Sequence, residues 1–243
     1  MSRAVLPLQH VFRPASRSPQ GRLPPLLVLL HGTGADEHDL LDVGEALQDE
    51  CEGQLAVLSL RAPLRAAHGG CAWFEGFSAA PEPAALQTTI PRSCSLVLEC
   101  LAAAPELYAT DPEHTALLGF SQGATIGWTL ATAKWPRPGL LCGSLLLSGR
   151  LFPEVAQPGS PLAALAASPA ELAGRRVWAT HGRLDGTTPV ALAHASVATA
   201  KQLWQDGDVF ERDVAFTLHS SGHDIPGGAL TAACEALRSM ASL

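Results

Sequence analysis

The fold is decided by the stretch His114-Thr-Ala-Leu-Leu-Gly-Phe-Ser-Gln-Gly-Ala-Thr-Ile-Gly-Trp-Thr-Leu-Ala131. Residues 115–119 form a short apolar run that predicts a buried strand, and residues 122–135 predict a helix. Between them, Gly119-Phe-Ser121-Gln-Gly123 matches G-x-S-x-G, in which a serine stands on a sharp strand-to-helix turn between small neighbours. Such a turn presents the hydroxyl of Ser121 as a nucleophile. The alternative is a glycine-flanked serine in an ordinary turn.

Short apolar runs alternate with longer amphipathic stretches on both sides of this motif. The alternation predicts an α/β fold with a mostly parallel central sheet and helices on both faces. Leu26–Leu30 is a continuous apolar run that suits a strand buried on both faces. Further strands are expected at residues 5–12, 55–60, 140–147, 176–180 and 209–218, and further helices at residues 39–50, 93–104, 189–205 and 229–240.

Composition and charge exclude several classes of protein. Hydrophobic residues make up 47% of the chain and charged residues 16%, which excludes a disordered chain. The formal net charge of −7 gives no electrostatic reason to bind nucleic acid or an anionic membrane. The apolar runs are too short to span a bilayer, the N-terminus lacks the apolar region of a signal peptide, and the six cysteines form no C-x-x-C pair. We therefore expect a cytoplasmic protein with reduced thiols.

Two segments rich in alanine and proline interrupt the alternation. Residues 61–91 carry Trp73, Phe74 and Phe77 and are expected to form a functional loop or lid. Residues 150–174 are expected to cap the fold or wrap its surface. Trp73 and Phe74 are candidate substrate-binding residues, because ligand pockets are mostly apolar and aromatic. Alternatively, these two side chains fasten the loop to the core.

An acid and a base are offered at two later strand ends. His181-Gly-Arg-Leu-Asp185 follows one apolar strand, and Ser220-Ser-Gly-His223 follows the last strand. Because catalytic groups of open α/β sheets gather at the carboxyl ends of the strands, Asp185 and His223 are expected to meet Ser121 there. In this triad His223 takes the proton of Ser121, and Asp185 holds the imidazole in the required tautomer.

Both assignments have plainer alternatives. Asp185 alternatively caps a loop or helix. His219 competes with His223, but it stands within the strand pattern. The two histidines are also four residues apart, which is a zinc-like spacing, yet no H-E-x-x-H, cysteine pair or carboxylate cluster accompanies them. We therefore assign no metal site.

The glycine-flanked turn Leu29-Leu-His-Gly-Thr33-Gly34 ends the early buried strand. An oxyanion hole of this type takes one backbone N–H from such a loop and one from the residue after the nucleophile. Thr33 and Gln122 are the expected donors. The competing interpretation is a phosphate-binding loop, but the P-loop lysine and the G-x-G-x-x-G spacing are both missing.

Four blocks of the chain resemble the phospholipase/carboxylesterase family of α/β-hydrolases, which includes acyl-protein thioesterases: residues 30–37, 119–124, 181–189 and 221–223. The resemblance runs across nearly the whole chain and implies a single α/β-hydrolase domain, residues 1–243. It implies a triad of Ser121, Asp185 and His223, with Thr33 and Gln122 as oxyanion donors. It also implies an enzyme without cofactors, often dimeric, that acts on carboxylic esters or acyl thioesters.

Three functions remain in competition. The favoured one is a serine carboxylesterase that hydrolyses short- to medium-chain esters through an acyl-enzyme intermediate. The second is an acyl-protein thioesterase or lysophospholipase, and the third is a catalytically silent α/β-hydrolase-fold binding protein.

Thr188 departs from the family pattern, which usually has an aliphatic residue before the proline. No charge is assigned to substrate recognition, and Arg61 is expected to lie on the surface or anchor a loop.

Overall fold

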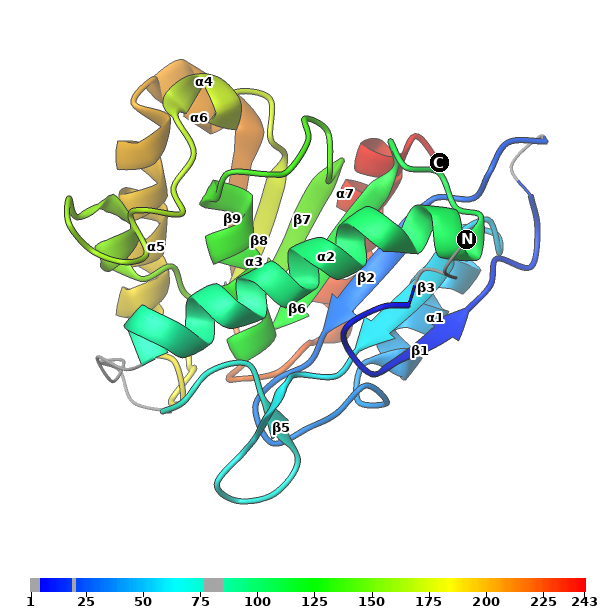
Figure 1. Ribbon diagram of the computed structural model, residues 1–243, viewed down its shortest axis with the longest axis horizontal. Coiled ribbons are helices and arrows are strands. Elements are labelled where there is room, and N and C mark those ends of the chain that lie inside the picture. Colours follow the sequence, from blue (N-terminus) through cyan, green and yellow to red (C-terminus); the bar gives the residue numbers. More distant parts are fainter. Residues whose placement is uncertain (1–4, 19–20, 77–84) are drawn as a thin grey trace.

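The computed structural model describes residues 5–18, 21–76 and 85–243 (Figure 1). Within these ranges, seven strands form the central sheet in the order β1-β3-β2-β6-β7-β8-β9. The strands are β1 His10–Arg13, β2 Leu26–Leu30, β3 Ala56–Leu60, β6 Thr115–Phe120, β7 Gly143–Leu147, β8 Val177–Gly182 and β9 Val214–His219. Neighbouring strands run parallel except β1, which is antiparallel to β3. This mostly parallel sheet confirms the expected fold class.

Helices cover both faces of the sheet (Figure 1). The buried side chains of α2 (Ile90–Tyr108), α3 (Gln122–Thr132) and α5 (Val190–Trp204) share one hydrophobic cluster, and those of α1 (Leu41–Glu50) and α7 (Gly227–Ala241) share the other. The shorter elements are α4 Pro169–Leu172, α6 Gly207–Asp213, the π-helix η1 Ala85–Thr89, the 3-10 helix η2 Pro153–Ala156, and the strands β4 Leu64–Arg65 and β5 Cys71–Ala72. In the described part of the chain, no helix is long and apolar enough to cross a membrane.

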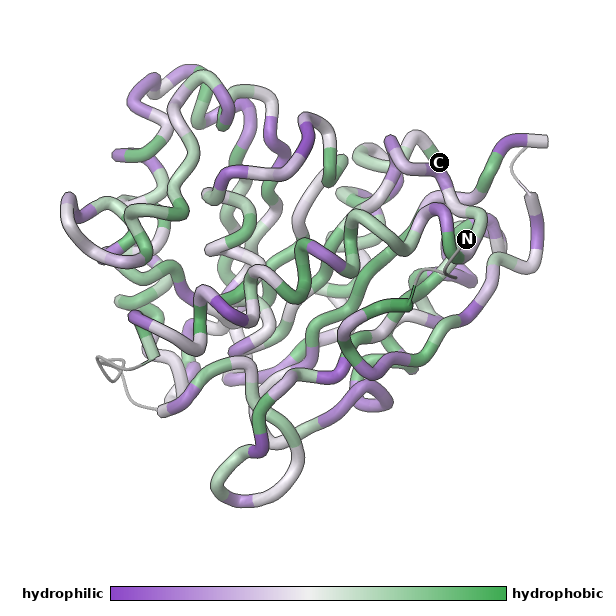
Figure 2. Tube along the Cα trace, in the orientation of Figure 1, coloured by the Kyte–Doolittle hydropathy of each residue, from purple (hydrophilic) through white to green (hydrophobic). Residues whose placement is uncertain are grey.

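Strand β2 shows why a continuous apolar run forms the middle of the sheet. Successive side chains of a strand point to opposite faces. Leu26, Val28 and Leu30 accordingly join the cluster under α2 and α3, whereas Leu27 and Leu29 join the cluster under α1 and α7. All five side chains are fully buried, and Figure 2 shows the strands as apolar segments inside a more polar periphery. The strand stays in register with its parallel neighbours on both sides.

Two strand predictions were wrong in part. The opening strand begins at His10 and not at residue 5, since Val5 is exposed and Pro7 offers no N–H to a ladder. The segment 209–213, expected to begin the last strand, belongs to α6. There the Asp206 carboxylate accepts the N–H groups of Asp208 and Val209 at 3.0 and 3.1 Å, which caps a helix. The other expected strands and helices agree with the structure to within a few residues.

Residues 61–91, expected as a loop or lid, and residues 150–174, expected as a cap, both contain regular structure. In the first, β4 pairs with β5, Cys71 forms a bridge with Ala35, and η1 leads into α2. Phe77 lies outside the described residues. In the second, residues 150–174 form η2 and α4 and bury Leu151 and Phe152 in the core. The second segment begins at the edge of the sheet where the parallel strands end and then runs to the opposite edge, where Ala166 forms a bridge with Ala133 after α3.

Candidate active site

Ser121 stands at the sharp turn between β6 and α3. Its backbone has φ 54° and ψ −117°, a conformation that costs an ordinary residue about 1–3 kcal/mol. The turn needs glycine on both sides. A Cβ at Gly119 would lie 2.5 Å from the Gly123 carbonyl oxygen, and a Cβ at Gly123 would lie 2.0 Å from the Leu30 carbonyl oxygen. The G-x-S-x-G pattern is therefore a consequence of how closely α3 approaches β2 and β6.

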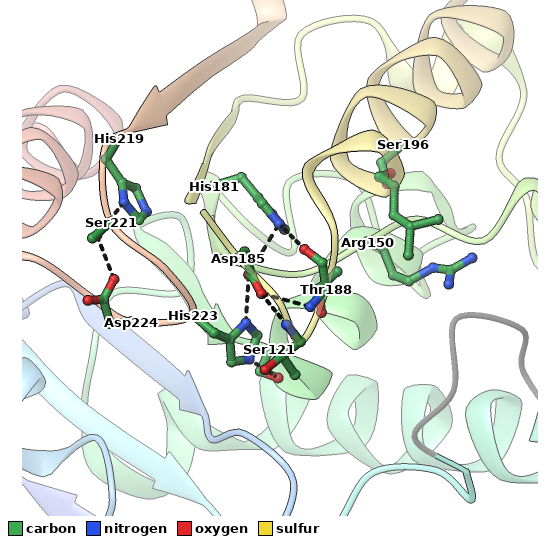
Figure 3. Close-up of polar contacts among 12 residues, drawn as sticks. Ser121, Arg150, His181, Asp185, Thr188, Ser196, His219, Ser221, His223 and Asp224 are labelled. Atoms are coloured by element: carbon green, nitrogen blue, oxygen red, sulfur yellow. Dashed lines mark hydrogen bonds and ion pairs between the residues drawn. The ribbon is translucent and has the colours of Figure 1, made fainter. Parts of the chain in front are cut away.

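Ser121, His223 and Asp185 form one chain of hydrogen bonds, which we call the relay (Figure 3). His223 Nε2 lies 2.8 Å from Ser121 Oγ, and His223 Nδ1 lies 2.7 Å from Asp185 Oδ2. A carboxylate only accepts hydrogen bonds, so Nδ1 carries the imidazole proton and Nε2 is left to accept the serine proton. Three residues from the ends of β6, β8 and β9 are thus in direct contact.

The Asp185 carboxylate is fully buried and held from several sides. Its Oδ1 accepts the backbone N–H groups of Thr187 and Thr188 at 2.9 and 2.7 Å. Its Oδ2 lies 3.3 Å from Nε2 of the buried His181, which also donates to the Thr188 carbonyl at 2.7 Å. Burial lowers the pKa of His181, which keeps this ring neutral. These contacts fix the carboxylate in the orientation that meets His223.

The two expected oxyanion donors each follow a residue of this turn or next to it: Gln122 follows Ser121, and Thr33 follows Gly32, where an added Cβ would lie 3.4 Å from Ser121 Cβ. Gln122 is the first residue of α3, so its N–H is among those that a helix leaves without an intrahelical acceptor. Thr33 follows β2, and its N–H makes no hydrogen bond to the described backbone. The Thr33 loop is anchored by the Gly34 N–H, which donates to the Cys71 carbonyl at 2.8 Å. Burial lowers the pKa of His31 in this loop, and the neutral ring accepts the Ala62 N–H at 3.1 Å.

The Gln122 side chain makes a clamp, defined here as its three hydrogen bonds to the backbone of residues 73–76. Its Oε1 accepts the Trp73 N–H at 2.9 Å, and its Nε2 donates to the carbonyls of Phe74 and Gly76 at 3.1 and 3.2 Å. The Trp73 indole N–H in turn donates to the His31 carbonyl at 2.8 Å. The segment 73–76 therefore connects the turn at Ser121 to the loop that carries Thr33.

The structure separates the two candidate substrate-binding residues. Trp73 is fully buried and serves to fasten the segment, so it offers no surface to a substrate. Phe74 lines a cavity of about 50 Å³ beside Ser121 and also a larger cavity of about 550 Å³ that extends along Thr33 and β4. Of the pair, only Phe74 is placed to contact an acyl or alcohol group.

The remaining sequence candidates lie apart from the relay. The Arg61 guanidinium pairs with both carboxylate oxygens of Glu37, which fits the expected anchoring role. His219, the competitor of His223, instead lies 2.8 Å from Ser221 Oγ, which donates to Asp224 at 2.6 Å. His219 and His223 thus bond different partners, although they are four residues apart.

Three residues near the relay were not predicted from the sequence. His181 was given no role from the sequence, yet it contacts the acid of the relay. Thr188, noted only as a departure from the family pattern, supplies an N–H to that acid and lines the small cavity. Arg150 also lines this cavity. It lies three residues beyond the end of β7, and that position at the sheet edge was the one available signal.

Comparison with known proteins identifies the family of the chain. The model of the phospholipase/carboxylesterase family matches residues 14–240. The chain belongs to the phospholipase/carboxylesterase family. Esterase PE8 shares 25% identity and a TM-score of 0.74, with 96% of this chain and 99% of that chain covered. No curated protein matches the sequence.

More distant solved structures share the fold. The Bacillus cereus carboxylesterase has 22% identity and a TM-score of 0.70, covering 96% of this chain and 95% of that chain. Arabidopsis thaliana SOBER1 has 16% identity and a TM-score of 0.71, covering 89% of this chain and 99% of that chain. The family and esterase PE8 support esterase activity in general, and these two more distant neighbours show the shared fold. The α/β-hydrolase fold inferred from the sequence is thereby confirmed.

Proposed function

We propose that this protein is a serine carboxylesterase that hydrolyses short- to medium-chain carboxylic esters through an acyl-enzyme intermediate. The observation that carries the proposal is the relay, in which 2.8 Å and 2.7 Å contacts join a strained, cavity-lining serine to an imidazole and a buried carboxylate. Nucleophile and base within hydrogen-bond reach, with the base oriented by a third group, are the requirements of nucleophilic acyl transfer.

The chemical steps follow from the positions of the atoms. Ser121 Oγ attacks the ester carbonyl carbon while His223 Nε2 takes the hydroxyl proton, and the backbone N–H groups of Thr33 and Gln122 donate to the carbonyl oxygen as it becomes negative. When the carbonyl re-forms, the C–O bond of the ester breaks and the alcohol leaves with the proton from Nε2. Water then attacks the acyl-enzyme by the same route, which releases the acid and returns the proton to Ser121.

The small cavity beside Ser121 supports a short acyl group. A cavity volume of about 10–15 Å³ is enough for one water-sized group. The cavity beside Ser121, of about 50 Å³, therefore holds roughly four such groups. The larger cavity at Thr33 favours the second candidate, a thioesterase or lysophospholipase, because about 550 Å³ accommodates a longer chain. Which cavity receives the acyl group separates the two functions.

A series of p-nitrophenyl esters from acetate to palmitate, with matching acyl thioesters, tests the proposal. We expect the highest kcat/KM between acetate and hexanoate, and a loss on the order of 10⁴–10⁶ in kcat for Ser121→Ala. A maximum at palmitate, or a preference for the thioesters, would favour the second candidate. Near-normal hydrolysis by Ser121→Ala would exclude both.

A further inference from the structure

Arg150 stands between the strand ends that carry the nucleophile and the acid. It lies three residues beyond Leu147, the last residue of β7, and β7 lies between β6 and β8 in the sheet. Its backbone N–H donates to Thr125 Oγ1 at 3.3 Å, in the first turn of α3, which ties this segment to the helix after Ser121. The fold therefore delivers a guanidinium to the neighbourhood of the reacting serine.

The small cavity has both the serine and this cation in its wall. Ser121 and Arg150 line it together with Thr187 and Thr188. The Arg150 guanidinium carbon lies 4.6 Å from the centre of the Phe152 ring, another residue of the same wall. A guanidinium packed over an aromatic face is restrained in position. A substrate group that is attached to Ser121 and occupies this cavity is therefore in the same cavity as the Arg150 guanidinium, whose position Phe152 restrains.

The direction of the cavity distinguishes the acyl side of an ester from its alcohol side. The alcohol must depart next to His223, because His223 Nε2 supplies its proton. In Figure 3, Arg150 lies on the far side of Thr188 from His223. Because Ser121 and Arg150 line the same small cavity, an acyl group that extends from Ser121 away from His223 enters the cavity that contains the cation.

The electrostatic setting of Arg150 favours an anion. Burial lowers the pKa of Arg150, and the carboxylate of Glu154 partly opposes this effect. A partly desolvated cation is stabilised by a negative ligand more strongly than a fully hydrated one. Guanidinium groups also match the planar, bidentate geometry of carboxylates.

We propose that Arg150 makes the enzyme selective for esters whose acyl group ends in a carboxylate, such as half-esters of four- or five-carbon dicarboxylic acids. This inference rests on the proposed function, since it places the acyl group of that reaction in the small cavity. The short length follows from the volume of the cavity, and the terminal charge follows from Arg150.

Two matched substrates test the inference. The acyl group of p-nitrophenyl hemisuccinate ends in a carboxylate, and in p-nitrophenyl 4-oxopentanoate a methyl group replaces one carboxylate oxygen at nearly the same size. We expect a higher kcat/KM for the hemisuccinate in the unmodified protein. In Arg150→Met the ratio of the two kcat/KM values should fall about 10- to 100-fold, the range for a hydrogen bond to a charged group. Arg150→Lys should retain part of the ratio, because it keeps the charge but not the fork of donors.

The control variant is Arg137→Met, which removes an exposed arginine at the opposite edge of the sheet and should leave the ratio unchanged. An equal loss of activity toward both substrates in Arg150→Met would assign Arg150 to holding the loop and overturn the inference. An unchanged ratio would also overturn it. If the unmodified protein hydrolyses neither ester and does not react with a fluorophosphonate, the proposed function itself fails.

Discussion

Replacing Gln122 with methionine should lower the unfolding free energy, and it should also lower kcat in the variant that remains folded. The change keeps the size and flexibility of the side chain but removes all three hydrogen bonds of the clamp. Leaving the buried Trp73 N–H without its acceptor costs about 1–3 kcal/mol, and the two carbonyls add to this, so we expect a loss of about 2–4 kcal/mol in unfolding free energy. At roughly 2–4 °C per kcal/mol for a chain of this size, a loss of about 3 kcal/mol lowers Tm by about 6–12 °C.

The effect on catalysis comes from the position of the clamp. The residue that loses its side-chain bonds also supplies an expected oxyanion donor, and Phe74 in the released segment forms part of the cavity wall. A displacement of about 1 Å at such a site costs on the order of 10²-fold in rate. We therefore expect kcat for p-nitrophenyl acetate to fall about 10- to 100-fold at a temperature where the variant is fully folded.

The matched control is Gln48→Met in α1. The Gln48 Nε2 donates to the carbonyls of Pro14 and Leu55 at 2.9 and 2.6 Å, far from the relay. This variant should lose stability and keep its kcat. Stability is followed by thermal and urea unfolding, and kcat by initial rates at saturating ester. Equal kcat values in both variants would refute the argument that the clamp positions the site.

Three further outcomes follow from the structure. Gly123→Ala should abolish soluble expression or activity, because its Cβ would meet a backbone oxygen at 2.0 Å, whereas Gly186→Ala, which has nothing within 4 Å, should behave as the unmodified protein. Asp185→Asn should lower kcat on the order of 10⁴-fold and leave Tm unchanged, because an amide selects the wrong imidazole tautomer. A loss of kcat under tenfold would contradict the role of Asp185. Burial lowers the pKa values of His31 and His181, so the unfolded chain binds more protons below about pH 6.5 and unfolding free energy should fall as pH drops from about 6.5. Urea unfolding at pH 7.5 and 5.5 checks this, and His181→Gln should flatten the dependence; stability that rises on acidification would be the contrary result.

The relay was predictable from sequence because each member belongs to a local pattern. Ser121 lies in a turn whose glycines are required by a close backbone approach, and Asp185 and His223 directly follow predicted strands. One rule, that strand ends of an open parallel sheet face a common edge, then suffices to bring them together. The register of individual distant strands is not needed for that inference.

The features of the site that could not be predicted from the sequence depend on contacts between segments that are distant in the chain. The partners of Gln122 lie 46 to 49 residues away, and nothing in the local pattern around Trp73 indicates that its indole bonds the His31 carbonyl. Arg150 became a candidate only once the sheet order placed β7 between β6 and β8. The segment 209–213 was misassigned because Val209 and Phe210 stand close before the apolar residues of the last strand, and a short pattern of this kind fits both a strand and a helix. The capping contact of Asp206 decides for the helix.

The most direct test of the account is to locate the site of covalent reaction. The protein is treated with a fluorophosphonate, digested, and analysed by mass spectrometry, with His223→Ala as a comparison. We predict a single adduct on the peptide that contains Ser121, formed at a rate that falls by several orders of magnitude when the imidazole is removed. An adduct on a different residue, or labelling of Ser121 that is equally fast without His223, would contradict it.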